Sequence, residues 1–377
     1  MKESPAGAIV RRAVRDGHAY RPGTTLEQAR REFGLERIIK LSSNENPLGT
    51  SPKALAALRH LDDLNVYVDN SYHELREKLA KYVGVGEENV IAGHGSNELL
   101  ELMFETFVDR GERVIMAKPT FSLFPQNAHL READAVEVPL KDGVHDLEAM
   151  AAAVNANTKM VLICDPNNPT ATNVAPAALE RFLSAVPDRV LVAIDQAYRE
   201  FMPEGSVDGI ALAMRRPNTL TYRTMSKAFG LASLRIGYAV GHADAIAYMQ
   251  QVRLPFNVTR ASIVAALAAL DDAAFVAESV RTNAEQRSRL QREFARMGLF
   301  AYLSAANFIA VQVPVAANAA YEDLLREGIA VRSGDALGLP GFLRITVGTA
   351  AENDVLIATL EKLLAAWKEA ATIGGPR

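Results

Sequence analysis

Apolar and polar residues form two kinds of segment in the middle of the chain. Short β-branched runs end in Gly, Pro, Asn or Asp, and longer stretches rich in Ala, Leu, Glu and Arg have helical spacing. Several of the short runs are apolar throughout, as strands buried on both faces of a sheet must be. The alternation predicts an α/β fold with a mainly parallel sheet covered by helices. The predicted strands are residues 89–93, 113–117, 159–164, 190–194, 219–222 and 236–240.

The pattern changes after about residue 260. Two long helical stretches, 261–270 and 275–297, precede strand-like runs at 307–313 and 342–347. We therefore expect a large domain over residues 41–260 and a smaller α+β domain over residues 261–377. Residues 1–40 show no partner of their own, and we expect an arm that packs on the small domain or on a second subunit.

Composition and charge narrow the class of protein. The 377 residues are 49% hydrophobic and 23% charged, which is enough to bury large cores in two lobes. The net charge of −4 is small and Lys and Arg are not clustered, so no nucleic acid or membrane surface is expected as a partner. We expect small-molecule substrates instead.

The chain also lacks the patterns of export, membrane insertion and metal binding. Neither a signal peptide nor a run of about eighteen apolar residues is present, which predicts a cytoplasmic protein. Cys164 is the single cysteine and reads as a buried structural thiol, so an internal disulfide and a cysteine zinc cage are excluded. The seven histidines are scattered, and no metal site is predicted.

Polar clusters follow the first three predicted strands, at the edge where open α/β sheets bind ligands. Residues 93–98 form a glycine turn that leads into a helix, which suits a phosphate but is equally explained as a turn with a helix cap. Phe121 follows the second strand. Asn168 follows the third, in a loop fixed by two prolines. Alone, each would be an ordinary core or turn residue.

Two later residues carry more chemistry. Asp195 ends a fully apolar strand, where a carboxylate needs a cationic partner or several donors, although a helix cap is the simpler alternative. Lys227 lies among mostly apolar neighbours, with Arg235 eight residues further on. Loss of water around this lysine would lower its pKa and make the amine nucleophilic.

Together these residues match the needs of a pyridine cofactor with a phosphate tail. Such a cofactor requires a lysine for a Schiff base, a carboxylate for the ring nitrogen, donors for the ring oxygen, an aromatic ring to stack on and an anion cradle. In that order the chain supplies Lys227; Asp195; Asn168 and Tyr198; Phe121; and Ser96, Asn97, Ser226 and Arg235.

Four segments make the resemblance to a known family specific: LSSNENPLG at 41–49, NNPT at 167–170, RTMSKAFGLA at 223–232 and LRITVG at 343–348. With them the chain resembles fold-type I pyridoxal-phosphate enzymes, and specifically the histidinol-phosphate aminotransferase family, almost from end to end. The resemblance implies a homodimer whose large domain holds a seven-stranded, mainly parallel sheet. It also implies ping-pong transamination of L-histidinol phosphate with 2-oxoglutarate, in histidine biosynthesis.

The resemblance also assigns roles. Lys227 would be the Schiff-base lysine and general base, and Asp195 the partner of the pyridinium nitrogen. Asn168 and Tyr198 would hold the phenolic oxygen, while Phe121 would stack on the ring. Lys227, Asp195 and Tyr198 are thus the expected catalytic residues. The phosphate would be bound by Ser96, Asn97, Ser226 and Arg235.

Three more residues extend this assignment. Tyr67 matches a family tyrosine that reaches a phosphate across the dimer interface. Arg344 would grip the substrate carboxylate, and Arg332 a second acidic group, since planar guanidinium groups suit bidentate contacts.

The chain departs from the family pattern at three positions. Ala171 stands where glycine is usual, Gln196 where glutamate is usual, and Val68 where proline follows the tyrosine. Alanine adopts a positive φ less easily than glycine, so we expect the loop after Asn168 to be reshaped. None of the three removes a group expected to touch the cofactor. The alternatives left open are an aromatic amino-acid aminotransferase, a pyridoxal-phosphate-dependent decarboxylase on the same scaffold, and a non-catalytic binding protein.

Overall fold

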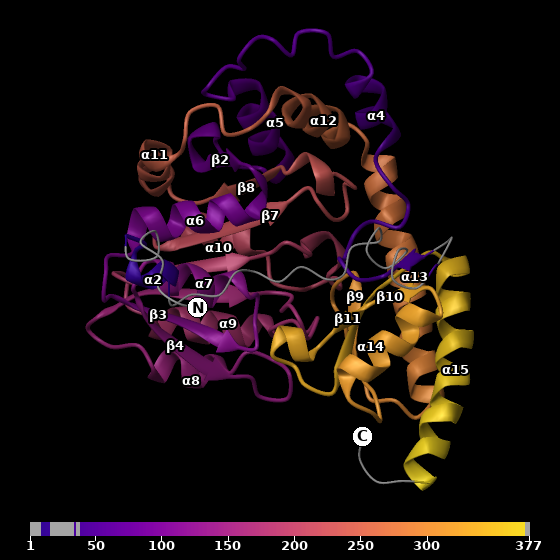
Figure 1. The fold of residues 1–377 in the computed structure, drawn as a ribbon. Coiled ribbons are helices and arrows are strands. Elements are labelled where there is room, and N and C mark those ends of the chain that lie inside the picture. Colours follow the sequence, from indigo (N-terminus) through magenta and orange to yellow (C-terminus); the bar gives the residue numbers. More distant parts are fainter. Residues whose placement is uncertain (1–8, 16–33, 35–37, 374–377) are drawn as a thin grey trace.

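The computed structural model describes residues 9–15, 34 and 38–373, and its centre is a seven-stranded sheet in the order β2-β8-β7-β6-β5-β3-β4 (Figure 1). Of these strands, β8 alone runs antiparallel to its neighbours, so the carboxyl ends of the other six share one edge. The strands are β2 (Val90–Gly93), β3 (Arg113–Lys118), β4 (Asp134–Pro139), β5 (Thr158–Cys164), β6 (Leu191–Asp195), β7 (Thr219–Thr224) and β8 (Gly237–Val240).

The α/β fold with a mainly parallel seven-stranded sheet is confirmed, and each of the six strands predicted from the pattern lies within two residues of an observed one. The apolar pattern missed β4. This strand lies at the edge of the sheet, and Val138 is its one buried residue, so it lacks the continuous apolar run of the interior strands.

Helices cover both faces of the sheet, as the alternation along β5 shows. Met160, Leu162 and Cys164 pack with helices α6, α7 and α11, whereas Val161 and Ile163 pack with α8 and α9 on the opposite face. From Pro52 to Leu270, the helices are α4 (Pro52–Leu58), α5 (His73–Val83), α6 (Gly95–Phe107), α7 (Leu123–Leu130), α8 (Leu147–Ala152), α9 (Pro176–Ala185), α10 (Gly209–Arg215), α11 (Ala243–Val252) and α12 (Arg260–Leu270). Short 3-10 turns lie at Glu87–Asn89, Arg199–Phe201, Ala232–Leu234 and Asp335–Leu337.

The C-terminal part forms a second layered unit beside the first (Figure 1). Its three-stranded antiparallel sheet has the order β11-β12-β9 and packs against helices. The two predicted helices after residue 260 correspond to α12 and α13, and the two predicted strands to β9 and β12. The elements of this unit are α13 (Ala273–Arg296), β9 (Phe308–Gln312), α14 (Ala317–Arg326), β10 (Ile329–Ala330), β11 (Arg332–Ser333), β12 (Phe342–Thr346) and α15 (Ala350–Ile373).

Two pieces of the predicted N-terminal arm are described. Strand β1 (Ile39–Lys40) pairs in parallel with β10 of the small unit. Helix α2 (Arg12–Arg15) lies against α7, where Arg11 Nη2 donates to the Leu130 carbonyl oxygen over 2.9 Å. The rest of the arm lies outside the described residues, so a contact with a second subunit and the domain boundaries at 40 and 260 stay predictions. Over the described part of the chain, no helix is long and apolar enough to cross a membrane.

Candidate active site

Asp195 and Lys227 lie at the carboxyl edge of the sheet, after neighbouring strands. Asp195 is the last residue of β6, and its Oδ1 accepts a hydrogen bond from the Ala197 N–H over 2.9 Å. Burial raises the pKa of this carboxyl to about 6, and the Ala197 N–H and the positive charge of Lys227 oppose the rise only in part. A buried carboxylate of this kind is stabilised by any cation placed beside it.

Lys227 follows β7 by three residues. Its Nζ donates to the Ser43 carbonyl oxygen over 3.2 Å and lies 5.8 Å from the centroid of the Tyr198 ring. Desolvation, followed by the positive charge of Arg344, lowers the pKa of this amine to about 8. Roughly a tenth of the lysine is therefore a free amine at pH 7, far more than an ordinary lysine offers.

Arg344 connects two other predicted residues, Asn168 directly and Tyr198 through Phe308. Its Nη1 donates to Asn168 Oδ1 and its Nη2 to the Ser42 carbonyl oxygen, each over 2.8 Å. The guanidinium lies 5.4 Å from the centroid of Phe308, and the Tyr198 ring meets the same phenyl ring edge to face at 5.1 Å. Asn168, Tyr198 and Arg344 thus form one contact group, and Lys227 lies near its Tyr198 ring.

Phe121 is linked to this group through Asn167. Thr120 Oγ1 donates to Asn167 Oδ1 over 2.9 Å, and Asn167 Nδ2 donates to the Pro119 carbonyl oxygen over 3.2 Å. These bonds tie the loop after β3, which carries Phe121, to the loop after β5, which carries Asn168. Phe121 is partly buried and meets Phe124 edge to face at 5.8 Å between ring centroids.

Arg235 lies against the start of α6, where the anion-binding site is predicted. Gly95 has φ +75°, and a Cβ added there would lie 2.5 Å from Arg235 Nη2, so only glycine allows the guanidinium this close to the helix start. Arg235 Nη1 also lies 3.3 Å from Ser226 Oγ. Ser96 and Asn97 occupy the first turn of the helix. Free N–H groups, a hydroxyl and a guanidinium at one helix start suit a phosphate.

The residues present therefore fit pyridoxal phosphate. The start of α6 with Arg235 would suit the phosphate, the buried carboxylate of Asp195 would suit a positively charged ring nitrogen, and the amine of Lys227 would suit the aldehyde. Among the described residues no cluster of His, Cys, Asp and Glu has the makeup of a metal site.

Tyr67 lies apart from this group, and Arg332 is connected to it through the strand pairing with Arg344. Tyr67 is 78% exposed and stacks on Phe256, with ring centroids 4.6 Å apart. Arg332 lies on β11 directly opposite Arg344 on β12, so both side chains leave the same face of the small sheet.

The three departures from the family pattern leave the site intact. Ala171 adopts a positive φ of 64° and is buried, so this alanine takes the left-handed backbone that was expected to be costly for it, and packing holds that backbone in place. Gln196 Oε1 accepts from Arg223 Nη2 over 3.1 Å, and Asp208 Oδ1 accepts from the same nitrogen over 3.0 Å, so a charged partner for this arginine persists without glutamate. Val68 is partly buried against the core.

Sequence reasoning gave no role to Ser42, Ser43 and Asn44, although the 41–49 segment supported the resemblance. The carbonyl oxygens of Ser42 and Ser43 accept from Arg344 and Lys227, and Asn44 Nδ2 donates to Tyr198 Oη over 3.0 Å. The one available signal was a polar run ahead of Pro47 in a chain whose other polar clusters follow strands.

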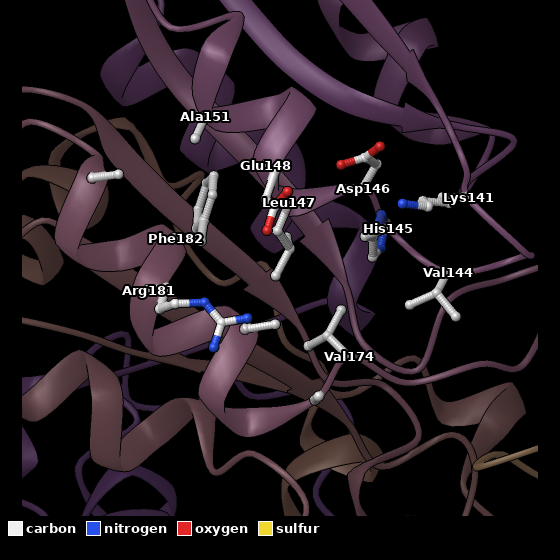
Figure 2. Close-up of a pocket in the computed structure, with 13 residues that line it drawn as sticks. Lys141, Val144, His145, Asp146, Leu147, Glu148, Ala151, Val174, Arg181 and Phe182 are labelled. Atoms are coloured by element: carbon white, nitrogen blue, oxygen red, sulfur yellow. The ribbon is translucent and has the colours of Figure 1, made fainter.

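A separate groove of about 540 Å³ lies between α8, α9 and the turn at Lys141 (Figure 2). His145 lines it and is itself buried, with Nε2 donating to the Cys164 carbonyl oxygen over 2.8 Å. Burial lowers the pKa of this histidine to about 4, so it is neutral at pH 7. The lining contains none of the predicted cofactor residues, so the groove is distinct from the active site.

Comparisons with known proteins agree with this arrangement. Residues 36–360 match the family described as aminotransferase class I and II. Histidinol-phosphate aminotransferase of Brevibacillus brevis is 43% identical over 92% of this chain and 95% of its own. The crystal structure of histidinol-phosphate aminotransferase from Sinorhizobium meliloti in complex with pyridoxal-5'-phosphate superposes with a TM-score of 0.86 at 28% identity, covering 96% of this chain and 98% of that one.

A solved aspartate aminotransferase of Thermus thermophilus is also similar, with a TM-score of 0.82, 25% identity and coverage of 94% and 99% of the two chains. The fold is thus shared by enzymes with different names, and it does not by itself identify a substrate. The fold and the site define a pyridoxal-phosphate-dependent aminotransferase. Within that class, the chain belongs to the histidinol-phosphate aminotransferase family.

Proposed function

We propose that the protein transfers the amino group of L-histidinol phosphate to 2-oxoglutarate, giving imidazole acetol phosphate and L-glutamate, in the cytoplasm and as a step of histidine biosynthesis. The main support for this substrate is the 43% identity, over 92% of the chain, to a histidinol-phosphate aminotransferase. An acidic substrate is supported independently by the pairing of Arg332 with Arg344 on neighbouring strands, which puts two arginines on one face of the small sheet.

The chain's own residues would hold pyridoxal phosphate in one orientation. Asp195 would pair with the ring nitrogen, Asn168 and Tyr198 would hold the ring oxygen, and Phe121 would stack on the ring. The phosphate would be bound by Ser96, Asn97, Ser226 and Arg235. When bound, pyridoxal phosphate supplies a ring that accepts electrons and so stabilises negative charge at the substrate α-carbon.

Lys227 acts as the proton carrier. Its amine, with a pKa lowered to about 8, takes a proton from the α-carbon of the amino donor and later returns a proton to the α-carbon of the 2-oxo acid. Asp195 remains ionised beside a positive charge and thereby favours removal of that first proton. Tyr198 and Asn168 keep the reacting groups aligned.

Arg344 would bind the substrate carboxylate, and Arg332 would bind a second acidic group. Histidinol phosphate offers a phosphate and no carboxylate, glutamate offers two carboxylates, and an aromatic amino acid offers one. A face that carries two arginines therefore suits the first two substrates better than the third.

Arg332→Ala is expected to lower kcat/KM for histidinol phosphate and glutamate about 30- to 1000-fold and to spare phenylalanine, because a bidentate charged contact is lost. Arg344→Ala should impair every donor. Steady-state kinetics with each donor, and 2-oxoglutarate as acceptor, measures both effects. Arg326→Ala, at an exposed α14 arginine paired with Glu322, is the matched control.

The same assay decides the substrate. In the wild-type protein kcat/KM for histidinol phosphate should exceed the values for phenylalanine, tyrosine and tryptophan. An aromatic amino acid that exceeds histidinol phosphate tenfold or more would overturn the proposed substrate. Release of carbon dioxide in place of amino transfer would favour the decarboxylase alternative.

The homodimer is the second part of the proposal. Tyr67 and Phe256 lie among further exposed apolar side chains, Leu64, Val66 and Leu254, which are 69%, 55% and 71% exposed. Such a cluster marks an interaction surface. In the proposed dimer Tyr67 of each subunit donates to the cofactor phosphate of the other subunit.

Tyr67→Phe should weaken cofactor binding about ten- to a hundredfold, the usual effect of losing a hydrogen bond to a charged group. Equilibrium dialysis measures it, with Tyr248→Phe on α11 as the control, since Tyr248 is also exposed. Subunits carrying Lys227→Ala and Tyr67→Ala should each be inactive alone and regain activity when mixed, because one site per mixed dimer is complete. An active enzyme that sediments as a monomer contradicts the proposal.

A further inference from the structure

Asn44 connects Tyr198 to the small unit, and nothing in the proposed mechanism has used it. We propose that the Asn44 amide donates a hydrogen bond to the Tyr198 oxygen and thereby directs the Tyr198 hydroxyl hydrogen toward the ring oxygen of pyridoxal phosphate. Asn44 is then a positioning residue, and Tyr198 acts as a donor because of it. The inference rests on the proposed cofactor site and is independent of which amino donor reacts.

Every polar group of Asn44 has a partner. The residue is 2% exposed and has φ 55°, a left-handed conformation that asparagine tolerates better than most residues. Its N–H donates to Thr346 Oγ1 over 2.9 Å, its carbonyl oxygen accepts from Asn307 Nδ2 over 3.0 Å, and its Nδ2 donates to Tyr198 Oη over 3.0 Å. The side chain is therefore held in one place.

The hydrogen bonds of Asn44 are consistent with its NH₂ group facing Tyr198. Thr346 Oγ1 accepts from the Asn44 N–H and donates to Asn44 Oδ1 over 3.3 Å. In this orientation Oδ1 accepts from a hydroxyl and Nδ2 donates to Tyr198 Oη. The Tyr198 oxygen then accepts, and its single hydrogen remains for another acceptor.

The environment of Tyr198 keeps its phenol protonated. Burial raises the pKa of the Tyr198 phenol well above its ordinary value, and the charge of Arg344 offsets this only in part, so the hydroxyl stays protonated at neutral pH. Lys227 Nζ lies 5.8 Å from the centroid of the Tyr198 ring, so Tyr198 is next to the lysine of the proposed cofactor site.

The same contacts couple the two units. Thr346 lies on β12 and Asn307 precedes β9, both in the small unit, whereas Tyr198 follows β6 of the large one. Asn44 thus transmits the position of the small sheet to a residue that holds the cofactor. When the ring oxygen of pyridoxal phosphate accepts a hydrogen bond, it binds less tightly the proton that it shares with the Lys227 nitrogen. The hydrogen bond therefore lowers the pKa at which the absorbance of bound pyridoxal phosphate changes.

The test is a pH titration of that absorbance in the loaded protein without any amino donor. Asn44→Ala should raise the apparent pKa by about half to one unit, the size expected for one hydrogen bond. Tyr198→Phe should raise it at least as much, and Asn44→Ala should add nothing in the Tyr198→Phe protein. Asn46→Ala is the matched control, because Asn46 lies in the same loop and donates to the Ala228 carbonyl oxygen and Ser279.

A second variant guards against misfolding. Asn44→Asp keeps the size and the left-handed backbone but turns the donor into an acceptor, so it should raise the pKa further than Asn44→Ala. Urea unfolding of the cofactor-free variants shows whether each is folded. An unchanged pKa in both Asn44 variants, or additive shifts of Asn44→Ala and Tyr198→Phe, would refute the inference. Failure of the wild-type protein to bind pyridoxal phosphate would instead refute the proposed site.

Discussion

Lys227→Ala is expected to lower kcat by at least about a thousandfold, since the variant loses both the attachment point of the cofactor and the base that moves the α-carbon proton. Borohydride treatment of the loaded wild-type protein should place a stable adduct on Lys227, detected by peptide mass spectrometry. Lys53→Ala is the control, because Lys53 on α4 donates to the Asp271 carbonyl oxygen at the surface. An adduct on any other lysine means that the assignment of Lys227 is wrong.

Because the pKa of Lys227 is lowered, the reaction of its amine with pyridoxal phosphate should depend on pH. Attack on the aldehyde requires the free amine, and its fraction rises about tenfold per unit below pH 8 and levels off above it, since the pKa is about 8. The rate at which cofactor-free protein takes up pyridoxal phosphate should follow that curve. Stopped-flow absorbance measures it, and a rate still climbing tenfold between pH 9 and 10 would show an ordinary lysine.

Asp195→Asn is expected to lower kcat about a hundred- to ten-thousandfold while the protein stays folded, because a neutral amide cannot stabilise a positive charge on the ring nitrogen. The amide oxygen of the substituted side chain can still accept from the Ala197 N–H, as Asp195 Oδ1 does, so the turn after β6 is preserved. Steady-state kinetics with a saturating donor separates kcat from KM. Near wild-type kcat would mean that Asp195 only caps this turn.

The same substitution should stabilise the cofactor-free protein. The folded pKa of Asp195, about 6, exceeds the ordinary value of 3.8, so the folded state holds the proton more tightly. Burying this carboxylate therefore costs little below about pH 4, and the cost grows until pH 6 and then stays constant. Asp195→Asn removes a cost of roughly 1–3 kcal/mol above pH 6.

Urea unfolding of the cofactor-free proteins should show a larger gain in the free energy of unfolding at pH 8 than at pH 5. Loss of activity together with a gain in stability is the signature of a residue kept for function. A destabilised variant at pH 8 would show that the carboxylate is held by donors that asparagine cannot replace.

Much of the fold follows from local pattern. Interior strands such as β5 and β6 are apolar at nearly every position because helices cover both faces, and that burial is visible in the sequence alone. The edge strand β4 lacks this signal and was missed. Asp195 and Lys227 could also be recognised as candidate site residues. Burying a carboxylate or an amine next to an apolar strand costs free energy of folding unless a partner or ligand compensates for it.

The sequence by itself therefore determined the α/β architecture, the edge of the sheet that carries chemistry and, with the resemblance, the family. Tertiary structure alone decided that Ser42, Ser43 and Asn44 contact the active-site residues. It also decided that Arg332 on β11 lies opposite Arg344 on the neighbouring strand β12, and that Ala171 has a left-handed backbone. The reason is distance along the chain. Asn44 and Thr346 are 302 residues apart, and a hydrogen bond between them depends on how two separate units pack, which leaves no periodic trace in either segment.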